Sequence, residues 1–175
     1  MKTPQSQAGA AMIEVLVAIL ITAFGILGFV GLQAQTAVSQ VEGYQRTQAL
    51  ILINDMAERI ALNRTNAAAY VADDIGVTNP ASCAAPVTRA AIDLCEWSQL
   101  IQGAAEVQGA AKLGAMLGAR ACISSPAPNQ YLISLVWQGV QSTGAPVTEC
   151  GKDAYASEDT RRAVTTVVQI ADLSS

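Results

Sequence analysis

An apolar run close to the N-terminus constrains the fold of this chain more than any other feature. The run extends from Ala10 to Leu32 and contains one charged residue, Glu14, near its start. At about 23 residues and 1.5 Å of rise per residue, it is long enough to cross the hydrocarbon core of a bilayer as an α-helix. A carboxylate inside such a segment is costly unless another group neutralises it, so Glu14 is a candidate functional residue.

The residues around the start of the run form a recognisable pattern. A short polar segment ends at Gly9, the apolar run begins at Ala10, and Glu14 is the fifth residue after Gly9. This pattern resembles the class III leader of type IV pilins and pseudopilins. The resemblance implies that residues 1–9 are a leader peptide, that a prepilin peptidase cuts between Gly9 and Ala10, and that the new amine of Ala10 is N-methylated. It also implies that Glu14 meets the N-terminal amine of a neighbouring subunit during assembly.

The match to the leader pattern has two departures, since Ala10 stands where Phe or Met is commoner and Met12 where Leu is commoner. Two other interpretations remain. A secretory signal peptide, cut near Ala34–Ala37, would need a basic start and an apolar region of about 7–15 residues. A plain single-span anchor would explain the length of the run, but neither Gly9 nor the position of Glu14.

Composition limits the classes of function. The chain has 175 residues, a net charge of −4 and no histidine. Its length allows one domain beside an anchor. Its basic residues are scattered, which argues against nucleic acid as a partner. The sequence contains no glycine-rich phosphate loop, nucleophile elbow or pair of catalytic acids. We therefore expect a protein that is not an enzyme and that binds no cofactor, metal or nucleic acid.

Four cysteines, Cys83, Cys95, Cys122 and Cys150, lie outside the apolar run. None forms a Cys-x-x-Cys motif, so zinc and redox sites are not indicated. An even number beside a membrane segment indicates disulfides in an oxidising compartment such as the periplasm, while four unrelated buried thiols are the alternative. Three pairings are compatible with four cysteines. We predict Cys83–Cys95, across the Pro86 turn, and Cys122–Cys150, between a strand and a later turn.

The helix that begins at Ala10 is expected to continue beyond the apolar run. The sequence becomes polar after Leu32, but no proline occurs before Pro80. We predict one long, partly broken helix from Ala10 to about Arg64, with residues 10–32 in the membrane or the filament core and residues 33–64 soluble. Its glycines are either sites of local unwinding in a filament or simply tolerated in lipid. Apolar residues at helical spacing indicate the face that packs on a soluble domain: Leu50, Ile53, Ala57, Ile60 and Ala61.

The remaining sequence indicates a small α+β domain. Residues 65–118 are expected to contain loops, one helix over Thr88–Ile101, and a loop or loosely formed helix over Gly103–Gly118. Residues 119–175 are expected to form an antiparallel sheet with strands at Ala119–Ile123, Gln130–Gln138 and Arg162–Ile170. Trp97 and Trp137 are expected in the core. Two acidic pairs are expected to be solvated loop residues: Asp73–Asp74 and Glu158–Asp159.

Two further segments indicate which group of pilins the chain resembles. Ile26–Ala34 contains Gly-Phe-Val-Gly-Leu-Gln, and Asn54–Arg64 contains an Asp-Met-x-x-Arg-x-x-x-Asn pattern. Both, together with Gln48–Leu50, are similar to segments of the type IV pilus modification protein (PilV) family of minor pilins. Weaker support comes from Asp93 with Trp97 and from the strand Tyr131–Trp137. The Leu-Pro-Gly stretch usual in that family is replaced by Gly103-Ala104-Ala105.

The resemblance implies the type IV pilin fold: a long N-terminal helix, anchored by its first half, packed on a small antiparallel sheet. It implies a minor pilin that joins other minor pilins to prime pilus assembly, with the fibre tip as one position for it. The implied partners are other minor pilins, the major pilin, a tip adhesin, the prepilin peptidase and the inner-membrane assembly platform.

The implied location is the bacterial inner membrane, with a periplasmic head, and then the pilus at the cell surface. Two alternatives remain open. One is a minor pseudopilin of a type II secretion system. The other is a membrane-tethered binding or adhesion domain that never polymerises.

Overall fold

The computed structural model describes residues 8–78, 82–84, 87–104, 106–109, 111–112 and 114–171. Its contacts divide the chain into two compact units, Met1–Val41 and Glu42–Ser175. We call the first unit the N-terminal segment and the second the head. They are described separately.

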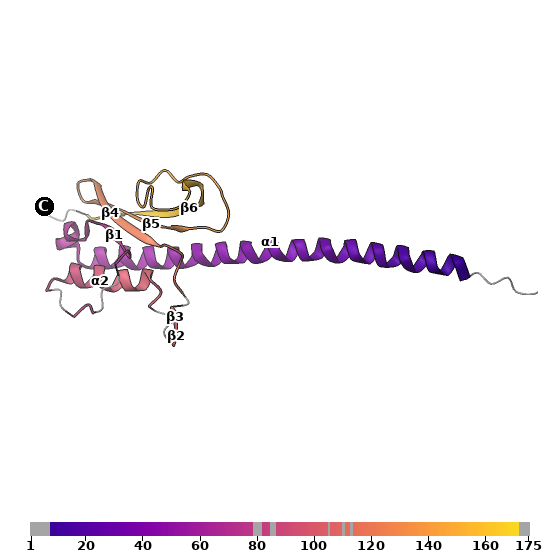
Figure 1. The fold of residues 1–175 in the computed structure, drawn as a ribbon. Coiled ribbons are helices and arrows are strands. Elements are labelled where there is room, and N and C mark those ends of the chain that lie inside the picture. Colours follow the sequence, from indigo (N-terminus) through magenta and orange to yellow (C-terminus); the bar gives the residue numbers. More distant parts are fainter. Residues whose placement is uncertain are drawn as a thin grey trace, which may run out of the picture. The chain divides into compact units, whose positions relative to one another are not determined.

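The N-terminal segment is helical throughout its described part. It belongs to helix α1, which extends from Ala8 to Leu62 without interruption (Figure 1). The expected long helix is confirmed, but it is not partly broken as predicted, since α1 is continuous from Ala8 to Leu62. The hydroxyl groups of Thr22 and Thr36 donate to the carbonyl oxygens four residues earlier, so they do not disturb the helical hydrogen bonds. By length and composition, this one helix could span a membrane.

In the head, α1 contributes one apolar stripe to the core. The stripe consists of Ala49, Ile53, Met56 and Ile60, all at most 1% exposed. These positions repeat every three to four residues, as one helix face requires. The predicted face was partly wrong, because Leu50 and Ala61 are exposed on its flanks and Met56 fills the position between Ile53 and Ile60.

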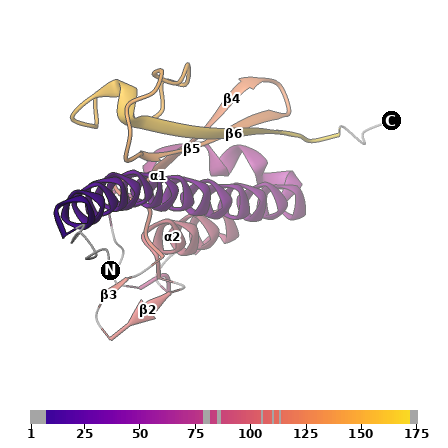
Figure 2. The same ribbon diagram turned by 90° about the vertical axis from the view of Figure 1, so that its right-hand side faces the viewer.

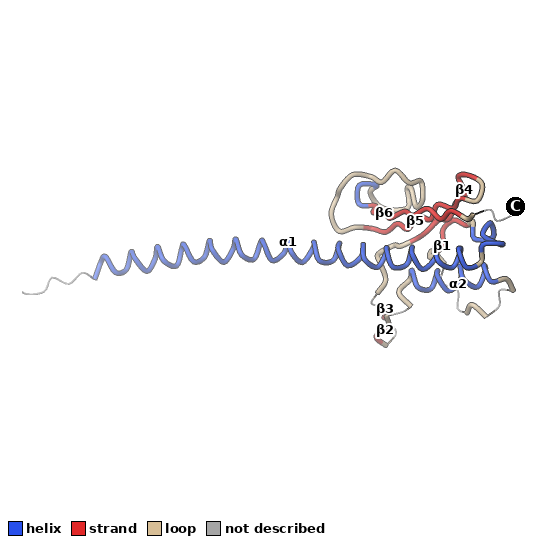
Figure 3. The backbone as a smooth tube through the Cα atoms, turned by 180° about the vertical axis from the view of Figure 1, so that it is seen from behind, coloured by secondary structure: helices blue, strands red, loops and turns tan. Residues whose placement is uncertain are grey.

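The sheet of the head is antiparallel and has the order β1-β4-β5-β6. Figure 3 shows its strands in red beside α1. Alternate residues of its strands, among them Ile123, Ile133 and Leu135, are buried on the face that joins the core. The α+β class and the fold expected for a type IV pilin are confirmed. The strands are β1 (Ala72–Ile75), β4 (Arg120–Ala127), β5 (Gln130–Gln138) and β6 (Arg161–Gln169).

Helix α2 (Arg89–Ile101) lies on the side of α1 opposite the sheet, so the head part of α1 is covered on both sides (Figure 2). Thr88 caps α2, because its hydroxyl oxygen accepts a hydrogen bond from the Ala91 N–H. Trp97 is fully buried, and its indole N–H donates to the Leu52 carbonyl on α1 at 2.8 Å. Trp137 is 2% exposed, so both tryptophans are core residues, as predicted.

Three segments differ from the sequence prediction. The predicted loop contains a 3-10 helix, η1 (Arg64–Tyr70), and strand β1, while its residues 79–81, 85 and 86 lie outside the described part. Gly103–Gly118 contains a two-stranded hairpin, β2 (Val107–Gln108) and β3 (Ala111–Lys112). Strand β4 continues past its predicted end at Ile123, because a register shift between Ser124 and Ala127 accommodates Pro126.

Candidate functional site

The N-terminal segment exposes a continuous apolar surface. The large apolar side chains between Met12 and Leu32 are 51–73% exposed. A surface of this extent is unfavourable in water and marks a region that contacts lipid or other apolar surfaces. The segment therefore has the properties required of a membrane-spanning or helix-packing element.

Glu14 lies exposed on this apolar surface. None of the ion pairs formed by the described residues includes it, so this part of the chain offers Glu14 no counter-charge. Helix α1 begins at Ala8, so Gly9 and Ala10 lie in its first turn. The structure thus places the three predicted processing and assembly residues within about two turns of one helix.

Arg59 joins α1 to α2 in the head. It forms ion pairs with Asp55 at 2.9 Å, Asp93 at 2.9 Å and Glu96 at 2.7 Å. Partial burial alone would lower the pKa of Arg59, but the three carboxylates outweigh it and raise the pKa above its usual value. The guanidinium therefore stays charged and clamps the two helices together.

Asp93 is 1% exposed and is satisfied by several donors. Besides Arg59, it accepts a hydrogen bond from the Tyr70 hydroxyl at 2.6 Å and pairs with Arg89 at 2.7 Å. Burial, followed by the bond to Asp93, raises the pKa of Tyr70. Asn63 donates to the Tyr70 hydroxyl at 3.2 Å, so η1 joins the same network. Asp55, Arg59 and Asn63, the polar residues of the motif found in the sequence, thus hold α1, α2 and η1 together.

A second ion pair links the start of the head to strand β6. The Glu42 carboxylate pairs with Arg162 at 3.2 Å and accepts hydrogen bonds from the Val140 and Gln141 N–H groups. Partial burial alone would raise the pKa of Glu42, but the Val140 N–H and Arg162 outweigh it and hold the pKa below its usual value. A Cβ at Gly139 would lie 2.7 Å from the Arg162 guanidinium carbon, so a larger residue there would displace this guanidinium.

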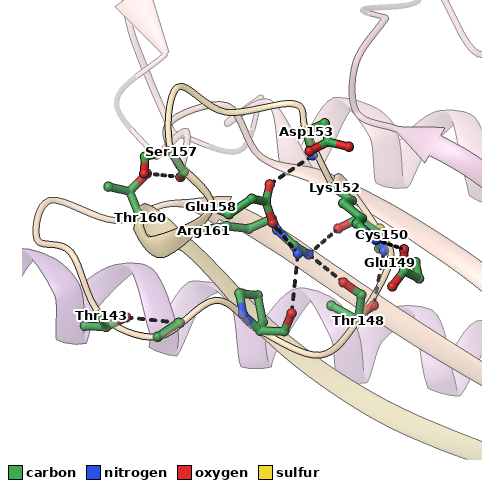
Figure 4. A network of polar contacts seen from close by, with 12 residues as sticks. Thr143, Thr148, Glu149, Cys150, Lys152, Asp153, Ser157, Glu158, Thr160 and Arg161 are labelled. Carbon is green, nitrogen blue, oxygen red and sulfur yellow. Dashed lines mark hydrogen bonds and ion pairs between the residues drawn. The ribbon is translucent and has the colours of Figure 1, made fainter.

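The long loop between β5 and β6 is organised around Arg161 (Figure 4). Arg161 is 3% exposed, and its guanidinium donates to the carbonyl oxygens of Thr148 at 2.6 Å and Cys150 at 2.9 Å. Its charge is balanced by Glu158, whose carboxylate accepts from Nε at 2.7 Å. The prediction that Glu158 is merely solvated was wrong, because Arg161 pairs with it and lowers its pKa.

All four cysteines are paired in the structure, Cys83 with Cys95 and Cys122 with Cys150. The first bond ties the segment before α2 to the helix itself. The second ties the β5–β6 loop to strand β4. Together with Arg161, this second bond holds the loop against the sheet.

A groove of about 900 Å³ runs along the outer face of the sheet beside this loop. Its walls include Ser124 and Ser134 from the sheet and Glu149 from the loop. Asp73 and Asp74 also line it, and they belong to β1 rather than to the loop in which they were predicted. Both are exposed, and Asp74 lies 3.6 Å from Arg120.

Sequence reasoning missed Glu42, Arg161 and Arg162. Their partners are distant along the chain, and single charged residues carry no local signal of burial. The glycine at position 139, directly after the strongest predicted strand, was the available hint that another group approaches the backbone there.

Comparison with known families agrees with this arrangement. The family model described as Tt1218-like, type IV pilin Tt1218, matches residues 31–102. The match supports a type IV pilin-like protein. It covers the head part of α1, strand β1 and helix α2, and therefore all residues of the Arg59 network. No curated protein and no solved structure matches the chain.

The comparison also bears on the class of function. Pilins are structural subunits that assemble with other pilins, which fits the expectation of a non-enzymatic protein. A membrane-anchoring helix and a location in a pilus fit the same family. The match supports the type IV pilin class but does not identify the PilV family within it.

Proposed function

We propose that this type IV pilin-like chain is a minor pilin of the PilV type, which joins other minor pilins to prime pilus assembly. The observation that carries the proposal is one helix, α1, that presents an uncovered apolar surface over residues 12–32 and packs into a disulfide-bonded head from residue 42 onward. The family match over residues 31–102 supports the pilin class. The motif residues Asp55, Arg59 and Asn63 support the PilV assignment, because all three are used in the head's polar network.

In this proposal the N-terminal segment is processed before assembly. The prepilin peptidase removes residues 1–9 and methylates the amine of Ala10, and Glu14 then pairs with the amine of a neighbouring subunit. Mass spectrometry of the mature chain tests this step, since it should begin at N-methylated Ala10. A terminus near Ala37 would instead identify a secretory signal peptide.

The proposed partners are other minor pilins, the major pilin and the inner-membrane assembly platform, with a tip adhesin as a further partner. Before assembly, the head faces the periplasm while the apolar segment stays in the inner membrane. After assembly, the chain belongs to the pilus at the cell surface, with the tip as its proposed position.

A deletion strain tests the proposal against both alternatives. We expect few surface pili, while the major pilin is still made and retained in the inner membrane. Normal piliation with blocked protein secretion would identify a minor pseudopilin. Normal piliation and normal secretion would identify a tethered binding domain, and either result would contradict the minor-pilin proposal. Complementation with the intact chain is the control.

A further inference from the structure

The Cys122–Cys150 bond joins a residue fixed in the sheet to a residue in a long loop. Cys122 belongs to β4 and lies opposite Ser134 of β5 in the antiparallel register, so the sheet holds its backbone in place. Cys150 lies in the middle of residues 139–160, which connect β5 to β6. Bringing one residue of a free loop to a fixed point costs conformational entropy. A contact that already holds Cys150 beside Cys122 while both are thiols would lower this cost.

Arg161 makes contacts of this kind on either side of Cys150 (Figure 4). Its guanidinium donates to the Thr148 carbonyl at 2.6 Å and to the carbonyl of Cys150 itself at 2.9 Å. Arg161 is the first residue of β6, so the sheet fixes its backbone, and Glu158 balances its charge. None of these contacts involves a sulfur atom, so they can form before the disulfide does.

Thr148 places the same segment over the strand next to Cys122. Its hydroxyl donates to the Ser134 hydroxyl at 3.3 Å and accepts from the Cys150 N–H at 3.3 Å. The Cys150 sulfur lies 3.8 Å from the Ser134 carbonyl oxygen. Because Ser134 is the register partner of Cys122, a loop held in this way presents Cys150 to Cys122.

The other two cysteines belong to a different layer of the head. Cys95 lies in α2 and Cys83 in the segment before it. Helix α2 lies on the side of α1 opposite the sheet (Figure 2), whereas Cys150 lines the groove on the outer face of the sheet. A loop that is held on the sheet therefore keeps Cys150 away from the two wrong partners.

We propose that Arg161 is a positioning residue for oxidation of the head, which holds the β5–β6 loop so that Cys150 meets Cys122. In the reaction, one cysteine thiolate attacks a disulfide oxidant, forms a mixed disulfide and releases one thiol of the oxidant. The second thiolate attacks the mixed disulfide at the cysteine sulfur and releases the other thiol. The two cysteines lose two protons and two electrons, which the oxidant gains. Arg161 takes part in neither transfer and raises the local concentration of one thiol at the other.

Thiol–disulfide equilibrium of the full-length chain in detergent tests the proposal, with glutathione as the oxidant. Alkylation at several ratios of oxidised to reduced glutathione, followed by peptide mapping, gives the effective concentration of each cysteine pair. Arg161→Met should lower that of Cys122–Cys150 by at least about tenfold, because two hydrogen bonds from a charged group no longer hold the loop. It should change that of Cys83–Cys95 by no more than about twofold, since this pair shares no contact with Arg161.

The neighbouring arginine provides the matched control. Arg162 is also partly buried, but its hydrogen bonds go to Glu42, Gln141 and Asp159. Arg162→Met should therefore leave the effective concentrations of both cysteine pairs within about twofold of the wild type.

The reactivity of a single thiol provides a direct check on the held loop. In a Cys122→Ser chain, Cys150 cannot form its native bond, and Arg161 should keep its thiol buried. Adding Arg161→Met should speed the alkylation of Cys150 by iodoacetamide about tenfold. Loss of a nearby positive charge would by itself slow this reaction, because it disfavours the thiolate, so a faster reaction reports an open loop. Thr148→Val, a milder change in the same segment, should act in the same direction in both experiments.

Three outcomes would overturn the proposal. The first is an unchanged effective concentration of Cys122–Cys150 in Arg161→Met. The second is an equal loss for both cysteine pairs, which would mean that Arg161 stabilises the whole head and does not position one cysteine. The third is unchanged or slower alkylation of Cys150 when Arg161→Met is added to Cys122→Ser, which would show that the loop stays closed without Arg161.

Discussion

At the scale of single residues, the charges of this chain fall into two groups. In the head, Arg59, Asp93 and Arg161 are held by several partners each, because a buried charge without a partner is costly. Glu14 differs, since it lies on an apolar surface and the described residues give it no opposite charge. The first group explains how the head is held together, whereas the role proposed for Glu14 requires a group on another molecule.

Replacement of Glu14 tests this distinction. Glu14→Ala should insert into the membrane at least as well as the wild type, because a charge is removed from the apolar segment. Assembly should fall sharply, because the proposed partner amine would be buried without a counter-charge. The measurement is the amount of the chain in the membrane and in sheared pili, with Glu14→Asp as the charge-conserving control. Wild-type amounts of Glu14→Ala in pili would contradict the docking role.

Loss of Arg59 should destabilise the head. Arg59→Met removes one of the three partners of buried Asp93 but leaves Arg89 and Tyr70 in place. We expect a loss of about 2–3 kcal/mol in the free energy of unfolding, somewhat less than for a buried charge left fully unpaired. Urea unfolding measures it. Arg46, exposed on the same helix, is the matched control, and Arg46→Met should change stability by no more than about 0.5 kcal/mol. Equal effects would show that the network is not stabilising.

Stability should depend on pH through Glu42. The pKa of its carboxyl is lower in the folded chain than its ordinary value of 4.5. Its stabilising contribution is therefore present above pH 4.5 and is lost as the pH falls through the folded-state pKa. Glu42→Gln should be less stable than the wild type at about pH 6, and the difference should shrink at about pH 3. Urea midpoints at both pH values measure it, and a difference that does not change with pH would contradict the assignment.

At the scale of elements, strong local patterns were predicted well. Strand β5 has its predicted bounds, and α2 and β6 are shifted by about one residue, within the usual uncertainty of element ends. Strand β1 could not be predicted from its own sequence. Its four residues include Asp73 and Asp74, which disfavour strands, and it forms only because β4 offers a free edge. Each strand of the β2–β3 hairpin has two residues, which is too few to show an alternation of apolar and polar residues in the sequence.

The polar contacts of the head were less predictable than its elements. Asp55 and Arg59 are four residues apart on one helix, so their ion pair was visible in the sequence. Glu42 and Arg162 are brought together only by the folded head, across 120 positions of the sequence. The leader-like pattern, in contrast, is entirely local, and for that reason Gly9, Ala10 and Glu14 could be proposed from the sequence alone.

The two disulfides constrain different elements and should contribute unequally. The cysteines of Cys122–Cys150 are 28 residues apart and those of Cys83–Cys95 are 12 apart. By the chain-entropy relation, loss of the first should cost about 3.5 kcal/mol and loss of the second about 3 kcal/mol. Urea unfolding of the two double Cys→Ser variants measures this order. Peptide mapping under non-reducing conditions checks the pairing, and a Cys95–Cys122 peptide would contradict it.

At the scale of the whole molecule, the two units have different physical requirements. The apolar surface of residues 12–32 requires lipid or other apolar helices, whereas the buried residues Ile53, Trp97 and Leu135 all belong to the head. The head therefore has a core of its own and does not depend on the N-terminal segment for stability. A truncation that removes the N-terminal segment should therefore separate membrane anchoring from recognition of neighbouring subunits by the head.

A secreted fragment that begins at Gln35 should therefore fold and interfere with assembly. We expect it to form both disulfides in the periplasm, because the core and the four cysteines lie entirely within it. Produced in wild-type cells, it should lower the number of surface pili, since it occupies the neighbouring heads without supplying the apolar segment that the filament needs. The full-length chain produced at the same level is the control and should not lower piliation. A folded, periplasmic fragment that leaves the number of pili unchanged would show that the head does not recognise the other subunits by itself, and recognition would then have to be assigned to the apolar segment.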